Sequence, residues 1–182
     1  MTADNTRRVD VVRTHLEICD LRALRAAPSP REATQLERVQ LSADDYRALY
    51  THVGARWHWR DRLLLADEEL DAYLASPDVH VWTLAVGDQR AGYFELQRYQ
   101  DMRVEIMYFG LAPAFIGRGL GGWMLTRAVE EAFALAASHV TLHTCTLDSS
   151  HALPNYLARG FAIVREEHYV ETLEGGSRAP GG

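Results

Sequence analysis

The chain has 182 residues, of which 47% are hydrophobic and 24% are charged, and its formal net charge is −6. These values are typical of one globular domain with a sizeable core. The negative charge argues against nucleic acid as a partner, because phosphate binding needs clustered Lys and Arg. The two cysteines, Cys19 and Cys145, predict no disulfide framework, and the absence of C-x-x-C and H-E-x-x-H motifs predicts no metal site.

The first residues are polar, and no apolar run reaches the length of a transmembrane helix. We therefore expect a cytoplasmic protein with no membrane partner. The sequence fixes no oligomeric state and is compatible with a homodimer. The Gly-rich residues 175–182 are expected to form a flexible tail.

In chain order, the first half of the sequence indicates two strands and two helices. Residues 9–18 and 34–41 have the composition or the alternation of strands, and a Pro-containing stretch separates them. Ser42 is followed by acidic residues, which predicts a helix that Gly54 ends. Residues 65–76 predict a second short helix with an acidic start.

Three strand-like runs joined by short turns come next, and they predict an antiparallel meander. A long helix follows, then a strand, a short helix and a last strand. This mixed order predicts a single α+β (mixed α/β) domain. The expected ranges are 79–86, 91–99 and 103–113 for the meander and 120–137 for the long helix. They are 139–147 for the next strand, 149–160 for the short helix and 161–172 for the last strand.

The segment FIGRGLGG, residues 115–122, contains the dinucleotide pattern G-x-G-x-x-G. An NAD site is disfavoured, because the loop follows a meander late in the chain and Asp148 comes too late to bind the ribose. Glycines before a helix can instead bind a pyrophosphate through backbone N–H groups and the helix dipole, with Arg118 adding a full charge. The alternative is a plain tight turn, where glycine only permits a positive φ.

Two segments resemble the GNAT-superfamily N-acetyltransferases. MYFGLAPAFIGRGLGGWML, residues 107–125, is similar to their acetyl-CoA loop, a strand and a Pro before [QR]-x-x-G-x-[GA] opening a long helix. LPNYLARGF, residues 153–161, is similar to their closing pattern of Tyr, three residues and Gly-Phe. The likeness covers about residues 104–162, and the meander matches the family's order. Ile116 stands at the [QR] position, so one usual phosphate contact is missing, and Ser149 replaces a common Asn.

The resemblance implies a GNAT-like fold, a central and mostly antiparallel twisted sheet of about six to seven strands flanked by helices. A V-shaped splay is expected between the strands at 104–111 and 139–147. The resemblance further implies one acetyltransferase domain over 1–174. Within it, residues 1–78 would form the acceptor side and residues 79–170 the acetyl-CoA-binding core.

The resemblance also implies acetyl-CoA as cosubstrate and no metal. The pantetheine would pair with the splayed strand, where one backbone N–H would stabilise the thioester oxyanion and Gly110 fits a bulge. Asn155 would take over the pantetheine contact of the missing Asn. The cofactor-binding residues expected are Phe109, Gly110, Leu111, Ile116, Gly117, Arg118, Gly119, Leu120, Gly121, Gly122 and Asn155.

Acetyl transfer to an amine needs a base and an acid. Glu105 is the candidate base, because it interrupts an apolar strand and histone-type family members carry their catalytic Glu at this offset. The alternative is a strand-edge Glu that faces solvent. Tyr156 is the candidate acid for the departing thiolate, as often in the family, and the alternative is a Tyr that only packs in the core.

Two other stretches carry reactive or aromatic side chains. Strand alternation puts His143 and Cys145 on one face, so a Cys nucleophile is conceivable, although a buried Cys is more often inert packing. Asp148 is expected to cap the next helix. RWHWRDRLLL, residues 56–65, either encloses an amine or is a core anchor with solvated arginines. The candidate acceptor residues there are Trp57, Trp59 and Arg60.

The sequence thus predicts an acetyl-CoA-dependent N-acetyltransferase that acts by direct attack of a primary amine of a small molecule or peptide. The alternative is a non-catalytic acyl-CoA-binding or regulatory module on the same fold, which Ile116 in place of Gln or Arg supports. A transferase for a longer acyl group or an alcohol acceptor also remains open. Turnover with any amine separates the first two hypotheses.

Overall fold

A computed structural model describes residues 6–174, and the predicted tail over 175–182 lies outside them. The strands form one seven-stranded sheet in the order β2-β3-β4-β5-β6-β1-β7. Among the strands of residues 6–174 only the β5–β6 pair is parallel, so the predicted mostly antiparallel sheet is confirmed. The strands are β1 (Thr6–Ile18), β2 (Thr34–Val39), β3 (Val79–Val86), β4 (Gln89–Arg98), β5 (Arg103–Leu111), β6 (His139–Cys145) and β7 (Ala162–Glu174).

The helices begin and end close to the predicted residues. Ser42 precedes α1, and its hydroxyl accepts a hydrogen bond from the Asp45 N–H at 3.2 Å, as expected for an N-cap serine. Short 3₁₀ turns lie at 21–23, 55–57, 61–63 and 113–115. The helices are α1 (Ala43–Gly54), α2 (Asp67–Leu74), α3 (Leu120–Ala134) and α4 (Ala152–Ala158).

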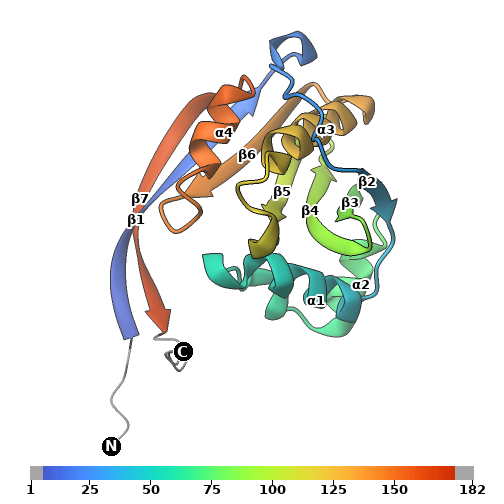
Figure 1. Cartoon of the computed structure of the whole chain (residues 1–182). Coiled ribbons are helices and arrows are strands. Elements are labelled where there is room, and N and C mark those ends of the chain that lie inside the picture. Colours follow the sequence, from blue (N-terminus) through green and yellow to red (C-terminus); the bar gives the residue numbers. More distant parts are fainter. Residues whose placement is uncertain (1–5, 175–182) are drawn as a thin grey trace, which may run out of the picture.

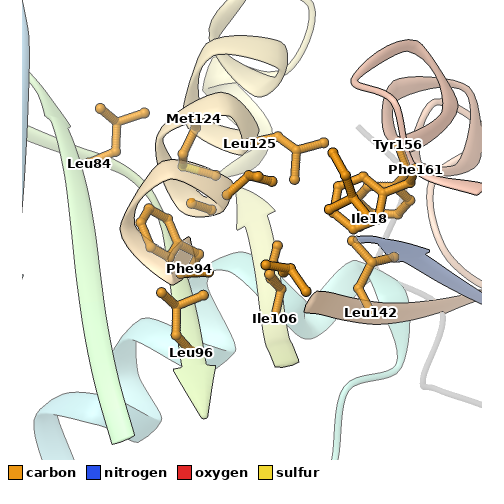
Figure 2. Close-up of a cluster of buried hydrophobic side chains, with 14 of the residues drawn as sticks. Ile18, Leu84, Phe94, Leu96, Ile106, Met124, Leu125, Leu142, Tyr156 and Phe161 are labelled. Carbon is orange, nitrogen blue, oxygen red and sulfur yellow. The ribbon is translucent and has the colours of Figure 1, made fainter. Parts of the chain in front are cut away.

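Helices cover both faces of the sheet, and each face has its own core (Figure 1). Tyr93 and Phe94 of β4 point to opposite faces, so they enter different cores. Phe94 packs with Met124 and Leu125 of α3 in the larger core (Figure 2). Tyr93 packs with α1 and α2 in the other core. Removing a side chain of this size from water contributes about 1.5–3 kcal/mol, so α3 is firmly attached to the strands that carry the site.

The N-terminal strand β1 lies inside the sheet, between β6 and β7 (Figure 1). Its second half, residues 13–18, pairs with β6, whereas its whole length pairs with β7. Residues 6–12 therefore form a two-stranded ribbon with β7 that extends past the end of β6. The sequence predicted a strand over 9–18, but nothing local to that segment indicated its partners.

The strands β5 and β6 separate soon after they meet. They pair only over 103–105 and 139–141, and residues 106–111 have left β6. The V-shaped splay that the family resemblance implied is thus confirmed. A bulge also occurs in β5, where Met107 is the extra residue opposite the Glu95–Leu96 step. The expected bulge at Gly110 is wrong, because Gly110 pairs in regular register with Tyr93.

Candidate active site

A cavity of about 620 Å³ occupies the splay and continues to the segment that follows α1. Its walls come from the free part of β5, the glycine loop, α4, the segment at 57–61, and the strands β6, β1 and β7. Parts of the chain that are far apart in sequence thus border one volume.

Two glycines of the loop have the backbone conformation that side chains disfavour. Gly117 has φ +82° and Gly119 has φ +79°, and α3 begins at Leu120. A Cβ at either glycine would meet no atom within 4 Å, so open space adjoins this backbone. Backbone N–H groups at the start of a 15-residue helix favour negative charge. The loop therefore has the conformation and the room that a pyrophosphate needs.

The other two loop glycines, Gly121 and Gly122, face neighbouring side chains. A Cβ at Gly122 would lie 2.8 Å from Nη1 of Arg159 and 3.2 Å from Cβ of Ala27, so a side chain there would require these neighbours to shift. The Gly121 carbonyl accepts a hydrogen bond from Nδ2 of Asn155 at 3.4 Å. This bond ties α4 to the loop. Leu120 is fully buried.

Arg118 pairs with an acidic side chain. Its Nε donates to Oε1 of Glu32 at 2.9 Å, a second nitrogen contacts Oε2, and the guanidinium lies over the Phe115 ring. Arg118, Gly119 and Leu120 are not among the residues that line the cavity, whereas Ile116, Gly117, Gly121, Gly122 and Asn155 are. The charge that we expected at the loop is therefore offset by Glu32.

The end of β5 lines the cavity with Phe109, Gly110 and Leu111, as expected. Gly110 is required by a close approach and not by a bulge. A Cβ there would lie 2.6 Å from Cγ1 of Val53 and 3.3 Å from the ring of Trp59. The glycine thus lets the aromatic wall of the cavity rest directly on the strand.

Glu105 lies behind the cavity wall. Its Oε2 accepts hydrogen bonds from Nη1 of Arg103 at 2.7 Å and from the Tyr99 hydroxyl at 3.2 Å, and its Oε1 is 3.5 Å from Nδ1 of His143. Burial by itself would raise the pKa of Glu105, but His143 and Arg103 outweigh burial and lower it to about 2. Glu105 does not line the cavity, whereas His143 does.

Tyr156 is buried and lines the cavity. Its ring makes edge contacts with Phe109 and Phe161 at 6.2 Å between centroids. The hydrogen bonds found over residues 6–174 include none from its hydroxyl. Burial, with a smaller effect of the Asp148 charge, raises the pKa of Tyr156 well above its ordinary value. The phenol thus stays protonated and is able to donate.

His143 and Cys145 both line the cavity, in keeping with the prediction that they share one face of the strand. Burial, and then the Asp148 charge, raise the pKa of the Cys145 thiol, which disfavours the thiolate that a nucleophile needs. Asp148 does not cap α4, where His151 is the N-cap residue. Its carboxylate instead accepts from the Thr144 hydroxyl at 2.7 Å and the Cys145 N–H at 2.9 Å, so it folds back onto its own strand.

The segment at 55–66 forms the far wall of the cavity with Trp57, Trp59 and Arg60. Trp59 contacts the rings of Tyr50 and Tyr108 at 5.5 and 5.1 Å between centroids. It is therefore both a core anchor and a cavity residue. The expectation of solvated arginines is wrong for Arg62, whose side chain is only 13% exposed.

A buried ion pair holds the same segment against the sheet. Nη2 of Arg62 lies 2.7 Å from Oε1 of Glu95, whose side chain is fully buried. The hydroxyls of Tyr73 and Tyr46 donate to the two Glu95 oxygens, at 2.5 Å for Tyr73. The guanidinium also lies 4.0 Å from the Tyr73 ring centroid. These contacts hold in place the loop that carries Trp57, Trp59 and Arg60.

Several cavity residues had no signal in the sequence. Tyr108 and Asp61 face each other, with the Tyr108 hydroxyl 3.4 Å from Oδ2 of Asp61. The opposite wall contains Arg13 of β1 and Tyr169 and Glu171 of β7. A sequence pattern could have found none of the last three, because their place depends on pairing between the two ends of the chain.

Over residues 6–174, no group of three or more His, Cys, Asp or Glu side chains is arranged as for a metal ion. No helix in the same range is long and apolar enough to cross a membrane.

Comparison with known proteins adds independent information. An uncharacterized N-acetyltransferase, YvbK of Bacillus subtilis (strain 168), is 31% identical over 111 residues, which cover 59% of this chain and 70% of that protein. A GCN5-related N-acetyltransferase from Kribbella flavida has a similar fold, with a TM-score of 0.62 at 16% identity. It covers 94% of this chain, whereas this chain spans only 61% of its length.

A Bacillus subtilis acetyltransferase solved in complex with CoA also has this fold, with a TM-score of 0.54 at 22% identity. The match covers 70% of this chain and 76% of the acetyltransferase. The model of the Acetyltransferase (GNAT) family matches residues 41–161. That range holds β3 to β6, the splay, the glycine loop and Tyr156. The chain therefore belongs to the GNAT family of acetyltransferases.

Proposed function

We propose that this chain is an acetyl-CoA-dependent N-acetyltransferase that transfers an acetyl group to a primary amine of a small molecule or peptide by direct attack. One observation carries the proposal. A single cavity runs from the glycine loop and the splayed end of β5 to an aromatic wall on the far side. A thioester and an amine can meet only where two such sites adjoin.

Bound acetyl-CoA would supply the activated acetyl group. In this proposal, Gly117, Gly121 and Gly122 hold the pyrophosphate side, and Phe109 to Leu111 offer free backbone groups to the pantetheine. An N–H of this strand end would also stabilise the developing oxyanion. Asn155, which already bonds the loop, borders the same volume.

The amine has to lose a proton before it attacks. For a lysine-like amine of pKa about 10.4, this costs about 4 to 5 kcal/mol at pH 7. We propose that Glu105, the candidate base, promotes the loss of the amine proton. We also propose that Tyr156 donates the proton to the leaving thiolate. The high pKa of the buried phenol supports this second role, because the group stays protonated until a strong base forms beside it.

We further propose that Trp57, Trp59 and Arg60 contact the acceptor. Trp59 and Tyr108 present ring faces or edges near the Asp61 carboxylate, and this combination suits a cationic amine. The β1–β7 ribbon would close the other side of the acceptor with Tyr169 and Glu171.

The test is titration of acetyl-CoA and of NAD into the purified protein, followed by an amine panel with detection of the released CoA thiol. We expect micromolar binding of acetyl-CoA, no binding of NAD, and turnover of at least one amine. Binding without turnover would favour the second candidate, a non-catalytic acyl-CoA-binding module. Ile116 and the Arg118–Glu32 pair favour that candidate, since they leave the loop with less positive charge for phosphate. Absence of acetyl-CoA binding would contradict both.

Replacement of Tyr156 by Phe should lower kcat by about 10²-fold or more, the range of a lost general acid, with little change in acetyl-CoA binding. No hydrogen bond of the hydroxyl over residues 6–174 is lost in the variant, so its thermal stability should stay near that of the parent chain. Steady-state kinetics and thermal melts measure the two effects. Full turnover by Tyr156→Phe would show that the phenol only packs in the core.

A further inference from the structure

We propose that His143 is the group that takes the proton from the acceptor amine, and that Glu105 is a positioning residue that acts through it. This inference rests on the proposed function and concerns the residue that removes the amine proton. It follows from the position of the two side chains relative to the cavity and from the hydrogen-bond and ionic partners of each.

The two residues meet where β5 and β6 begin to separate. Glu105 is the last residue of β5 paired with β6, opposite Thr141, and His143 lies two residues further on the same face of β6. The imidazole borders the cavity, and the carboxylate lies behind the imidazole with Nδ1 3.5 Å from Oε1. A substrate in the cavity thus reaches the ring before the carboxylate.

Glu105 is already held by cations and donors. Arg103 and Tyr99 donate to its Oε2, and the Arg103 guanidinium stacks on the Tyr99 ring at 3.8 Å from the centroid. A carboxylate held ionised in this way is a weak base for an ammonium group. The same carboxylate is well suited to orient a histidine and to stabilise its protonated form.

The charged and titratable neighbours of His143 come from three other strands. Glu105 faces it from β5, and His15 faces it from β1, with ring centroids 5.8 Å apart. Behind His15, β7 supplies Glu167 and Arg165, each 3.2 Å from the His15 Nε2. On β6 itself, Cys145 shares the face. Glu105 is thus the carboxylate in contact with His143, whereas Glu167 is taken by His15.

The proton transfers balance as follows. With Nδ1–H directed at Glu105, the neutral ring carries its lone pair on Nε2, which accepts one proton of the ammonium group. The amine nitrogen then forms the N–C bond to the thioester carbon, and the C=O electron pair moves to the oxygen. When the C=O bond re-forms, the C–S bond breaks and the sulfur leaves with the Tyr156 proton. The second proton of the nitrogen restores Tyr156 through water, and the imidazolium releases its proton to solvent. The net products are the amide, the CoA thiol and one proton.

Kinetics of His143→Ala provide the first test. We expect kcat to fall by about 10²-fold or more, the range of a lost general base, with the KM for acetyl-CoA nearly unchanged. The acid limb of the pH–rate profile should disappear, and added imidazole should restore part of the rate. His15→Gln is the matched control, since it alters the adjacent ring outside the cavity lining and should keep the parent rate and profile.

The resting tautomer provides a second test that needs no acceptor. Imidazole ¹⁵N spectra of the full chain should show His143 protonated on Nδ1, and Glu105→Gln should shift that equilibrium. An Nε2-protonated ring that Glu105→Gln leaves unchanged would overturn the proposal.

The possible failures can be told apart. Parent-like kcat and pH profile in His143→Ala would overturn only the role of His143. A parent chain that acetylates no amine would overturn the proposed function together with that role.

Discussion

Replacement of Gly117 by Glu is expected to lower the affinity for acetyl-CoA by about a hundredfold, or about 2.7 kcal/mol. The Glu side chain would enter the open space beside the loop, where no atom lies within 4 Å of the Cβ position. There its carboxylate would repel the phosphates, and one close pair of like charges near a protein surface is worth up to about 4 kcal/mol. Calorimetric titration with acetyl-CoA measures the change.

The chain offers a matched control for the backbone effect. Gly87, in the β3–β4 turn, has φ +56° and also has open space around its Cβ position. Glu at either site costs about 1–2 kcal/mol of stability because of the left-handed conformation. Gly87→Glu should therefore lose similar stability but keep the parent affinity. Equal affinities of the two variants would mean that the pyrophosphate binds elsewhere.

Replacement of Glu95 by Gln should destabilise the chain by about 3–5 kcal/mol, the range found when one member of a buried ion pair is removed. The reason is the Arg62 guanidinium, whose side chain is only 13% exposed and would lose its counter-ion. The amide would also offer one acceptor oxygen where the Tyr46 and Tyr73 hydroxyls now bond two. Urea unfolding measures the loss.

The Arg98–Asp78 pair is the control on the surface. Its nitrogen–oxygen distance is 2.9 Å, close to that of the buried pair, but its side chains are 40% and 45% exposed. Asp78→Asn should therefore cost less than about 1 kcal/mol. If the two variants lost similar free energies of unfolding, burial would not be the reason why the Glu95–Arg62 pair matters for stability.

The elements of the fold could be predicted because their signals are local. The alternation of β3 to β5, the Ser42 cap and the glycine loop each depend on a few adjacent residues. The position of β1 could not be predicted, since it depends on pairs such as Val11 with Tyr169, which are far apart in the chain. The wall that Arg13, Tyr169 and Glu171 add to the cavity was unforeseen for the same reason.

The candidate site was predictable where a motif defines it. The end of β5, Tyr156 and part of the loop border the cavity, as do Trp57, Trp59 and Arg60, whereas Arg118, Gly119 and Leu120 of the loop do not. The partners of charged side chains were not predictable. The pairing of Arg118 with Glu32 and the contact of Glu105 with His143 each join separate segments, and the second depends on the register of the one parallel strand pair.

The central position of β1 has a consequence for the way this chain acquires its structure during translation. Among the seven strands of residues 6–174, β1 is synthesised before the other six, yet both of its neighbours, β6 and β7, are synthesised after them. Until then its backbone groups lack their sheet partners, and such an unpaired strand is prone to associate with other chains. Long-range pairing of this kind also slows folding. The cavity is complete only when β7 has docked, so nascent chains that lack this strand contain the glycine loop but not the complete cavity.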